Sequence, residues 1–183
     1  MHLSIAAGIG LGTLARWLGT ERVVRAMPNT PALVGQGMTG LYTPAATPDA
    51  DRELAESALR STGQLLWVDD EALIDSVTAV SGSGPAYVFF FIEALEQAGV
   101  EMGLTAEQAH QLAVGTFTGA SALAAASNDT PAVLRQRVTS KGGTTFAAIS
   151  SMEADRVKDS IVRALHAARL RAQELEQEFG RAD

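Results

Sequence analysis

A run of glycines between hydroxyl residues, VTSKGGTT at residues 138–145, is the segment of the chain best suited to chemistry. It stands directly before a helical pattern that begins at about Thr145. The first N–H groups of a helix have no partner within the helix, and the helix dipole places partial positive charge there. Because glycine permits close approach, the segment is suited to hold a small anion such as a carboxylate. An ordinary loop with a hydroxyl cap is the alternative.

A second glycine–serine cluster, SGSGPAY at residues 81–87, precedes three phenylalanines at 89–91. Small residues on a helix let another backbone come near, so we assign the cluster to packing and the phenylalanines to a core or dimer interface. The three histidines, His2, His110 and His166, show no metal-ligand spacing, and there is no cysteine. We therefore predict no metal site and no thiol chemistry.

Composition narrows the possible partners. The 183 residues carry a net charge of −7, and no basic stripe interrupts the acidic balance, so nucleic acid and anionic membranes are not expected partners. The longest uncharged apolar stretch, residues 77–92, is shorter than the ~20 residues that cross a bilayer. No basic region precedes an apolar core at the N-terminus, so we expect no signal peptide and a cytoplasmic protein.

The elements that must position these residues change character along the chain. Up to about Val68, short strand patterns alternate with helical ones, which predicts a mostly parallel sheet flanked by helices. The strands are expected at Leu3–Ala7, Arg22–Met27, Thr39–Tyr42 and Gln64–Val68, with helices at Leu11–Leu18 and from Thr47 to about Thr62.

From Asp69 onward every pattern is helical. The expected helices are Glu71–Gly99, interrupted at Ser81–Pro85 by proline and glycine; Thr105 to about Ser127; Thr130 to about Val138; and Thr145 to Phe179, broken near Ser150–Met152. A capping box, Thr105 with Gln108, marks the second of these.

The sheet half is too small for a complete doubly wound domain. Gly8, Gly10 and Gly12 follow a strand, but their spacing is not the GxGxxG of a dinucleotide-binding turn. We expect the front of the sheet domain to be missing from this chain.

Five motifs, in this order and spacing, closely resemble those of the pyrroline-5-carboxylate reductase family. They are SIAAGI at 4–9, RAMPNTPALVGQG at 25–37, EALIDSVTAVSGSGPAYVF at 71–89, GLTAEQAHQLA at 103–113 and VTSKGGTT at 138–145. The resemblance implies the C-terminal half of a Rossmann-type sheet at residues 1–69. An all-helical dimerisation and substrate-binding domain follows at residues 70–183.

The resemblance also implies an activity, the reduction of 1-pyrroline-5-carboxylate to L-proline by hydride from NADPH or NADH. A protonated cyclic imine accepts hydride without a strong protein acid, so positioning is the main requirement. Because the dinucleotide fingerprint is missing, we expect cofactor binding to be severely weakened and the chain as given to be inactive.

By the same resemblance, the turn at the start of the last helical region would bind the substrate. The turn Ser140–Thr144 would present backbone N–H groups to the carboxylate, and the Thr145 hydroxyl would lie near the ring nitrogen as the catalytic group. Ser140, Gly142, Gly143, Thr144 and Thr145 are thus the substrate-binding residues implied in this turn. Lys141 stands where the family commonly has proline. Glu71 would lie near the substrate ammonium or iminium; otherwise it is an acidic residue favourable in a helix's first turn.

Cofactor contacts are implied in the sheet half. Ile5, Ala6 and Ala7 match the strand end beside the nicotinamide, with plain buried strand residues as the alternative. Asn29 lies in the loop after the next strand, at the edge where ligands bind in such sheets, and a turn-stabilising asparagine is its alternative.

The family resemblance further implies a homodimer or a ring of dimers. Two other interpretations stay open at this point. One is a natural short module for dimerisation or proline binding without redox activity. The other is a related dehydrogenase of the same plan, such as a β-hydroxyacid dehydrogenase, which the imine-enzyme motifs disfavour.

Overall fold

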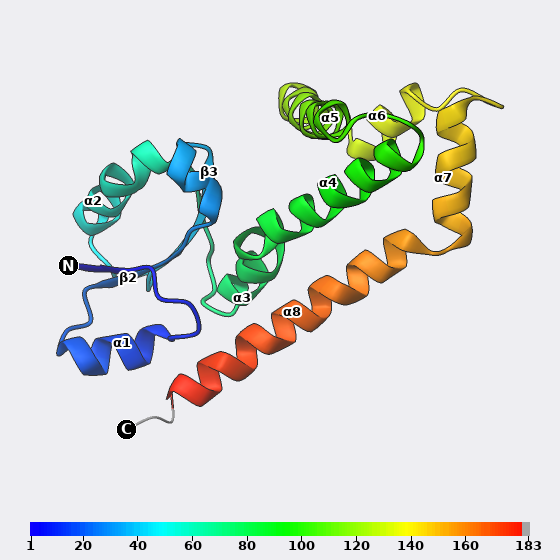
Figure 1. Ribbon diagram of the computed structural model, residues 1–183. Coiled ribbons are helices and arrows are strands. Elements are labelled where there is room, and N and C mark those ends of the chain that lie inside the picture. Colours follow the sequence, from blue (N-terminus) through cyan, green and yellow to red (C-terminus); the bar gives the residue numbers. More distant parts are fainter. Residues whose placement is uncertain (181–183) are drawn as a thin grey trace. The chain divides into compact units, whose positions relative to one another are not determined.

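The computed structural model describes residues 1–180, and the chain divides into two compact units (Figure 1). The first unit contains residues 1–86 together with the chain from Arg163 onward, and the second contains residues 87–162. Within residues 1–180, no helix is both long and apolar enough to cross a membrane.

The first unit contains a four-stranded sheet, in the order β1 (His2–Ser4), β2 (Val23–Met27), β3 (Gly37–Tyr42) and β4 (Gly63–Trp67). β1 pairs with β2 and β3 with β4 in parallel, but β2 and β3 are antiparallel. The prediction of a mostly parallel sheet was therefore wrong at its centre. Segment 28–36 holds only a short 3-10 helix, Thr30–Val34, and so short a connection reverses the chain, whereas a parallel crossover needs a dozen residues or more.

Neighbouring residues of a strand point to opposite faces of the sheet, so the apolar side chains of β2 lie on both faces, and a helix packs against each. On one face, Val24 and Ala26 of β2 pack with Ala55 and Leu59 of α2 (Asp49–Leu59). α2 continues into a 3-10 turn, Arg60–Thr62. On the other face, Val23 packs with two leucines of α1 (Leu11–Leu18). Figure 1 shows α1 and α2 on the two sides of the sheet.

The first long helix is interrupted where Pro85 predicts it. α3 (Leu73–Val77) passes into a π-helical turn, Thr78–Gly82, before α4 (Gly84–Glu101) begins. Pro85 has no backbone N–H to continue the ladder. A Cβ on Gly82 would lie 2.6 Å from the Cε of Met27, so the turn also lies directly against β2.

Four more helices follow: α5 (Ala106–Ala126), α6 (Pro131–Arg137), α7 (Thr144–Ala154) and α8 (Val157–Gly180). The capping box of α5 is confirmed, since Thr105 Oγ1 accepts from Gln108 N and Gln108 Oε1 accepts from Thr105 N. The predicted break near Ser150–Met152 lies instead at Asp155–Arg156. Arg156 turns the corner in the left-handed region, with φ of 54°.

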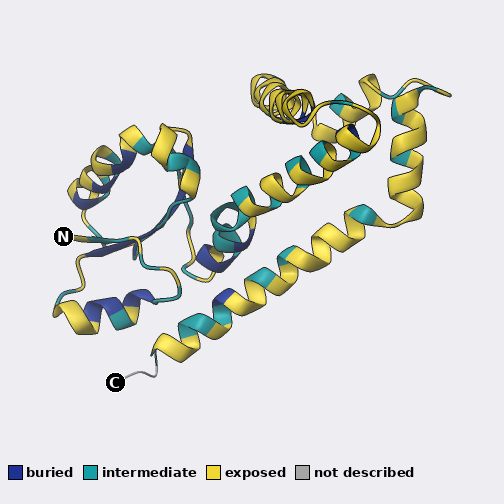
Figure 2. Cartoon of the chain, viewed as in Figure 1, coloured by how far each residue is buried: buried dark blue, intermediate teal, exposed yellow. Residues whose placement is uncertain are grey.

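The second unit buries very little of itself. All of residues 87–162 are described, and only Gly99, Ala109 and Ala113 are buried among them. Figure 2 shows α5 almost wholly exposed. Phe89 and Phe90 are 58% and 68% exposed, and many aliphatic side chains of α4–α7 are exposed too. These helices therefore present an apolar surface that one copy of the unit does not cover.

Candidate functional site

The glycine turn before α7 has the geometry of an anion site. Gly143 is the N-cap of this 11-residue helix and has no side chain to offer the first N–H groups. The Ala147 N–H makes the first helical bond, to the carbonyl of Gly143, so the N–H groups of residues 144–146 have no helical acceptor. The Gly143 N–H is already used, since it donates to the Ser140 carbonyl at 3.0 Å.

The shape of the turn requires glycine at position 142 and leaves little room for a side chain at position 143. Gly142 has φ of +75°, a conformation that side-chain-bearing residues rarely adopt. A Cβ on Gly143 would lie 2.6 Å from Ser140 Oγ. Lys141 is exposed, and no part of this geometry depends on its side chain. The predicted substrate residues from Ser140 to Thr145 are thus brought together in a single turn.

Two neighbouring helices show what this turn lacks. Thr105 caps α5 by accepting from Gln108 N at 3.2 Å, and Thr130 caps α6 by accepting from Val133 N at 3.4 Å. At the start of α7 the corresponding position is glycine, so the positive end of the helix dipole is left open to a ligand.

The predicted cofactor residues of the sheet half lie at one edge. Because β1 and β2 are parallel, Ile5–Ala7, which follow β1, and Asn29, which follows β2, stand at the same end of the sheet. β1 ends at Ser4, so the predicted strand Leu3–Ala7 was too long. Ile5 is 62% exposed, which contradicts the alternative of a plain buried strand residue.

Asn29 is held by three hydrogen bonds. Its Nδ2 donates to the carbonyl and to the Oγ of Ser81, both at 3.2 Å, and its Oδ1 accepts from Met38 N at 2.9 Å. These bonds tie the end of β2 to β3 and to the π-helical turn, as expected of a turn-stabilising asparagine. Its contact with a cofactor stays a prediction.

Glu71 is also held within the first unit. Its Oε1 accepts from the backbone N–H of Leu11 at 2.6 Å and from Arg25 Nη1 at 2.8 Å. The carboxylate therefore caps α1, whose N-cap is Gly10, while α3 begins two residues after Glu71. A substrate contact of Glu71 stays a prediction.

Sequence reasoning did not single out Arg25, which is 2% exposed and also bonds Glu176 Oε2 at 3.1 Å. A signal was present, because a charged residue inside the apolar strand VVRAM must find a partner. Close by, Asp75 is buried, and burial followed by the charge of Glu176 raises the pKa of its carboxyl group. A cavity of about 520 Å³ lies beside these groups. It is lined by the carboxylates of Glu71, Asp75 and Glu176 and by the amides of Gln173 and Gln177.

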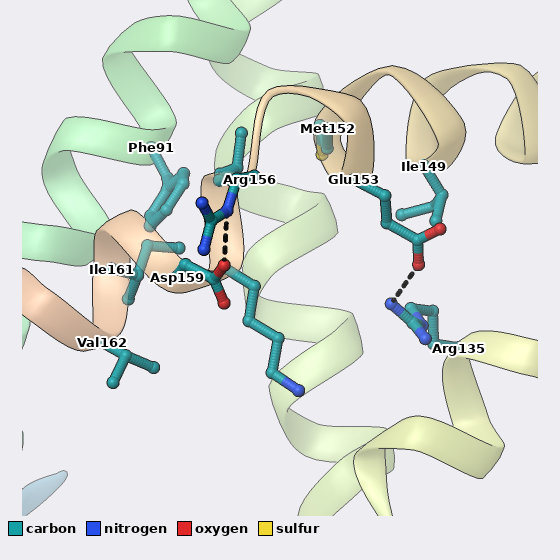
Figure 3. Close-up of a pocket in the computed structure, with 11 residues that line it drawn as sticks. Phe91, Arg135, Ile149, Met152, Glu153, Arg156, Asp159, Ile161 and Val162 are labelled. Carbon is teal, nitrogen blue, oxygen red and sulfur yellow. Dashed lines mark hydrogen bonds and ion pairs between the residues drawn. The ribbon is translucent and has the colours of Figure 1, made fainter.

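A second cavity, of about 450 Å³, lies in the helical unit (Figure 3). Its wall is mainly apolar, with Phe91 and Ile161 among the lining residues, and the residues of two ion pairs also line it. Arg156 Nε lies 2.9 Å from Asp159 Oδ2, and Arg135 Nη1 lies 3.4 Å from Glu153 Oε1. None of the predicted site residues lines it, and its apolar wall is shared by α4, α7 and the start of α8.

The predicted residues thus form two groups. Ser140 to Thr145 lie in the helical unit, whereas Ile5–Ala7, Asn29 and Glu71 lie in the sheet unit. Within residues 1–180, no group of three or more histidine, aspartate or glutamate side chains is arranged to hold a metal ion.

Residues 71–175 match the family model described as pyrroline-5-carboxylate reductase dimerisation. The chain belongs to the pyrroline-5-carboxylate reductase family. It is 50% identical over 179 residues to the pyrroline-5-carboxylate reductase of Pseudomonas aeruginosa, a match that covers 97% of this chain and 66% of the relative. The relative from Haemophilus influenzae is 40% identical, with the same two coverages. The chain therefore spans slightly less than two thirds of these family members.

Solved structures of the family share the fold. The Coxiella burnetii enzyme superposes with a TM-score of 0.89 at 42% identity, covering 94% of this chain and 64% of that one. A Plasmodium falciparum pyrroline carboxylate reductase, solved with NADP bound, gives 0.87 at 32% identity and covers 95% and 70%. The predicted family and the predicted fold class, a partial Rossmann-type sheet followed by helices, are confirmed.

Proposed function

We propose that this chain is the greater part of a reductase that converts 1-pyrroline-5-carboxylate to L-proline with hydride from NADPH or NADH. The observation that carries the proposal is the uncapped start of α7, built on the glycine turn at residues 142–143, in a chain of this family. The names of the relatives support the reaction, and the NADP bound to the Plasmodium falciparum enzyme supports a nicotinamide cofactor.

In the proposed mechanism the substrate carboxylate accepts hydrogen bonds from the N–H groups at the start of α7 and is stabilised by the helix dipole. The Thr145 hydroxyl hydrogen-bonds the ring nitrogen, which carries a proton in the reactive iminium. When bound, the nicotinamide supplies the hydride that goes to the C=N carbon. Residues Ile5–Ala7, small or exposed at the end of β1, and Asn29 at the same sheet edge would hold it. Catalysis then depends mainly on orientation.

Thr145→Val tests the role of the hydroxyl. We would extend the 183-residue chain at its N-terminus with the matching region of the Pseudomonas aeruginosa relative and measure kcat/KM. The expected loss is on the order of 10–100-fold, or about 1.4–2.7 kcal/mol, the usual value of a hydrogen bond to a charged group. The matched control, Lys141→Pro, should change kcat/KM only a few-fold because the turn acts through its backbone. Equal losses would mean that Lys141, not Thr145, contacts the substrate.

We also propose that the 183 residues alone bind NADPH very weakly and reduce no imine at a useful rate, because they contain no phosphate-cradling GxGxxG turn. Calorimetry with NADPH, beside an assay of cofactor oxidation, tests this. Micromolar affinity with turnover would contradict it. A chain that binds proline but never NADPH, even after extension, would favour the module without redox activity.

We propose that residues 1–69 form the domain that contacts the cofactor, and that residues 70–183 form the domain for dimerisation and substrate binding. The exposed apolar surface of α4–α7 supports a homodimer, or a ring of dimers. Such obligate interfaces bury more than about 2,000 Å². Light scattering after size exclusion at low micromolar concentration is the measurement. A well-folded monomer of 19.1 kDa would contradict the interface.

A further inference from the structure

The end of α8 lies directly against the turn that follows β1. A Cβ on Gly8 would be 3.1 Å from the Cβ of Leu175 and 3.1 Å from the Cδ2 of Phe179. A Cβ on Gly10 would be 2.5 Å from Glu176 Oε1. All these residues belong to the first unit. The last turns of α8 therefore approach the backbone of this turn most closely at Gly8 and Gly10.

One buried guanidinium joins this contact to the turn. Arg25, which pairs with Ser4 in the β1–β2 register, holds Glu71 at 2.8 Å and Glu176 at 3.1 Å. Glu71 uses the oxygen that faces Arg25 to accept from the Leu11 N–H, at 2.6 Å. A continuous set of contacts thus runs from α8 through Arg25 and Glu71 to the residue that closes the turn.

We propose that the last turns of α8 hold the Ile5–Gly10 turn in shape, and that Arg25 and Glu176 are positioning residues for the ligand of that turn. The identity of this ligand as a nicotinamide rests on the proposed function, whereas the holding of the turn does not. The reductase would then form the nicotinamide side of its site from the β1 turn together with the last turns of α8, which are more than 150 residues apart in sequence.

Glu176 has a matched control on the same helix. Glu178 bonds Arg171, also of α8, at 2.8 and 3.3 Å. Glu176 instead bonds a buried arginine of β2. Both substitutions, Glu176→Gln and Glu178→Gln, remove one negative charge from the last turns of α8, so a difference between them isolates the contact with Arg25.

Amide hydrogen exchange of the 183-residue chain is the test, because two amides report on the turn. The Ala6 N–H donates to Ser4 Oγ, and the Leu11 N–H donates to Glu71. In Glu176→Gln we expect both to exchange about tenfold faster, with the amides of β3 unchanged, whereas Glu178→Gln exchanges like the parent chain. Unchanged exchange in Glu176→Gln, or a uniform loss of protection over the whole sheet, overturns the proposal.

A double-mutant cycle gives a second test. Gly10 has φ of −70° and ψ of 154°, which alanine adopts without strain, so Gly10→Ala should act mainly by displacing Glu176, with a smaller effect from alanine at the N-cap of α1. We expect it to speed Leu11 exchange about tenfold in the parent chain and much less in Glu176→Ala, where only the N-cap effect is left. Equal effects in both backgrounds overturn the proposal.

The ligand is tested separately with saturating NADPH in the N-terminally extended chain, with and without Glu176→Gln, because the 183 residues alone are expected to bind NADPH very weakly. Added protection of Ala6 and Leu11 in the parent chain, reduced about tenfold in Glu176→Gln, is the expected result. Added protection that is equal in both chains overturns the positioning role. Absence of any added protection in the parent chain counts against the proposed cofactor contact, while the exchange rates without NADPH still decide whether α8 holds the turn.

Discussion

Gly63 should be among the least replaceable residues of the sheet. It is the first residue of β4 and pairs with Gly37, the first residue of β3. Its φ is 137°, and a Cβ placed on it would lie 2.1 Å from the carbonyl oxygen of Gly37. The added atom would meet backbone rather than a movable side chain, so Gly63→Ala must push the two strands apart where their pairing begins.

The cost has two parts. A side chain in this region of φ costs of order 1–3 kcal/mol. Forcing a methyl group into a packed backbone costs a further ~1–3 kcal/mol. We therefore expect a loss of about 3 kcal/mol or more in the free energy of unfolding, or roughly 6–12 °C in Tm for a chain of this size. Gly12→Ala is the control of opposite sign. Gly12 is exposed in the first turn of α1 with nothing within 4 Å of an added Cβ, and alanine there should gain stability, by at most the ~0.8–1.0 kcal/mol found in helix interiors.

Urea unfolding at one fixed protein concentration measures both changes, since association would make stability depend on concentration. The two tryptophans report on this unit: Trp67 lies in β4, where its Nε1 donates to Glu56, and Trp17 lies in α1. A Gly63→Ala chain within about 0.5 kcal/mol of the parent, the range of ordinary surface substitutions, would refute the glycine pairing of β3 and β4.

Three further predictions concern the same unit. Thr39→Val should raise stability by about 1 kcal/mol in urea unfolding, because Thr39 is buried and its Oγ1 has no hydrogen-bond partner in the part of the chain described. The pKa of the Asp75 carboxyl group is raised above 3.8, so the free energy of unfolding should fall as pH rises from 3.8 through the raised pKa. Asp75→Asn should remove this fall, and urea midpoints measured across that pH range would show it. The pKa of Asp51 is lowered below 3.8 by its hydrogen bond to Arg22, so the stability gained from this ion pair is present above pH 3.8 and lost as pH falls further. In urea unfolding, Asp51→Asn should be less stable than the parent at neutral pH and should approach the parent's stability in acid.

Sequence reasoning succeeded where the determinants are local. The capping box of α5 needs only Thr105 and Gln108, and the interruption before α4 needs only Pro85 and its glycines. The glycine turn at α7 was found for the same reason. The corner at Arg156 was missed because no glycine or proline marks it. The direction of β3 was missed because alternation does not encode direction, although the shortness of segment 28–36 does.

Contacts between residues far apart in sequence could not be predicted from local patterns. Arg25 and Glu176 are 151 residues apart in the chain, and the sequence around one does not indicate that the other is its partner. The apolar strand around Arg25 required some carboxylate, but the choice among the 21 acidic residues is made by the packing of α8. In the same way, no sequence pattern near Asn29 predicts its hydrogen bonds to Ser81.

The sparse burial within α4–α7 bears on how this protein refolds. A unit that buries only three small residues of its own gains little from collapsing alone, so, under the proposed homodimer, we expect its final folding step to be an encounter between chains. Refolding should then slow as the protein is diluted, with a rate that depends on the square of chain concentration. The sheet unit, with its own core around Val24 and Leu41, can form first. Until chains meet, the exposed apolar side chains of these helices favour aggregation.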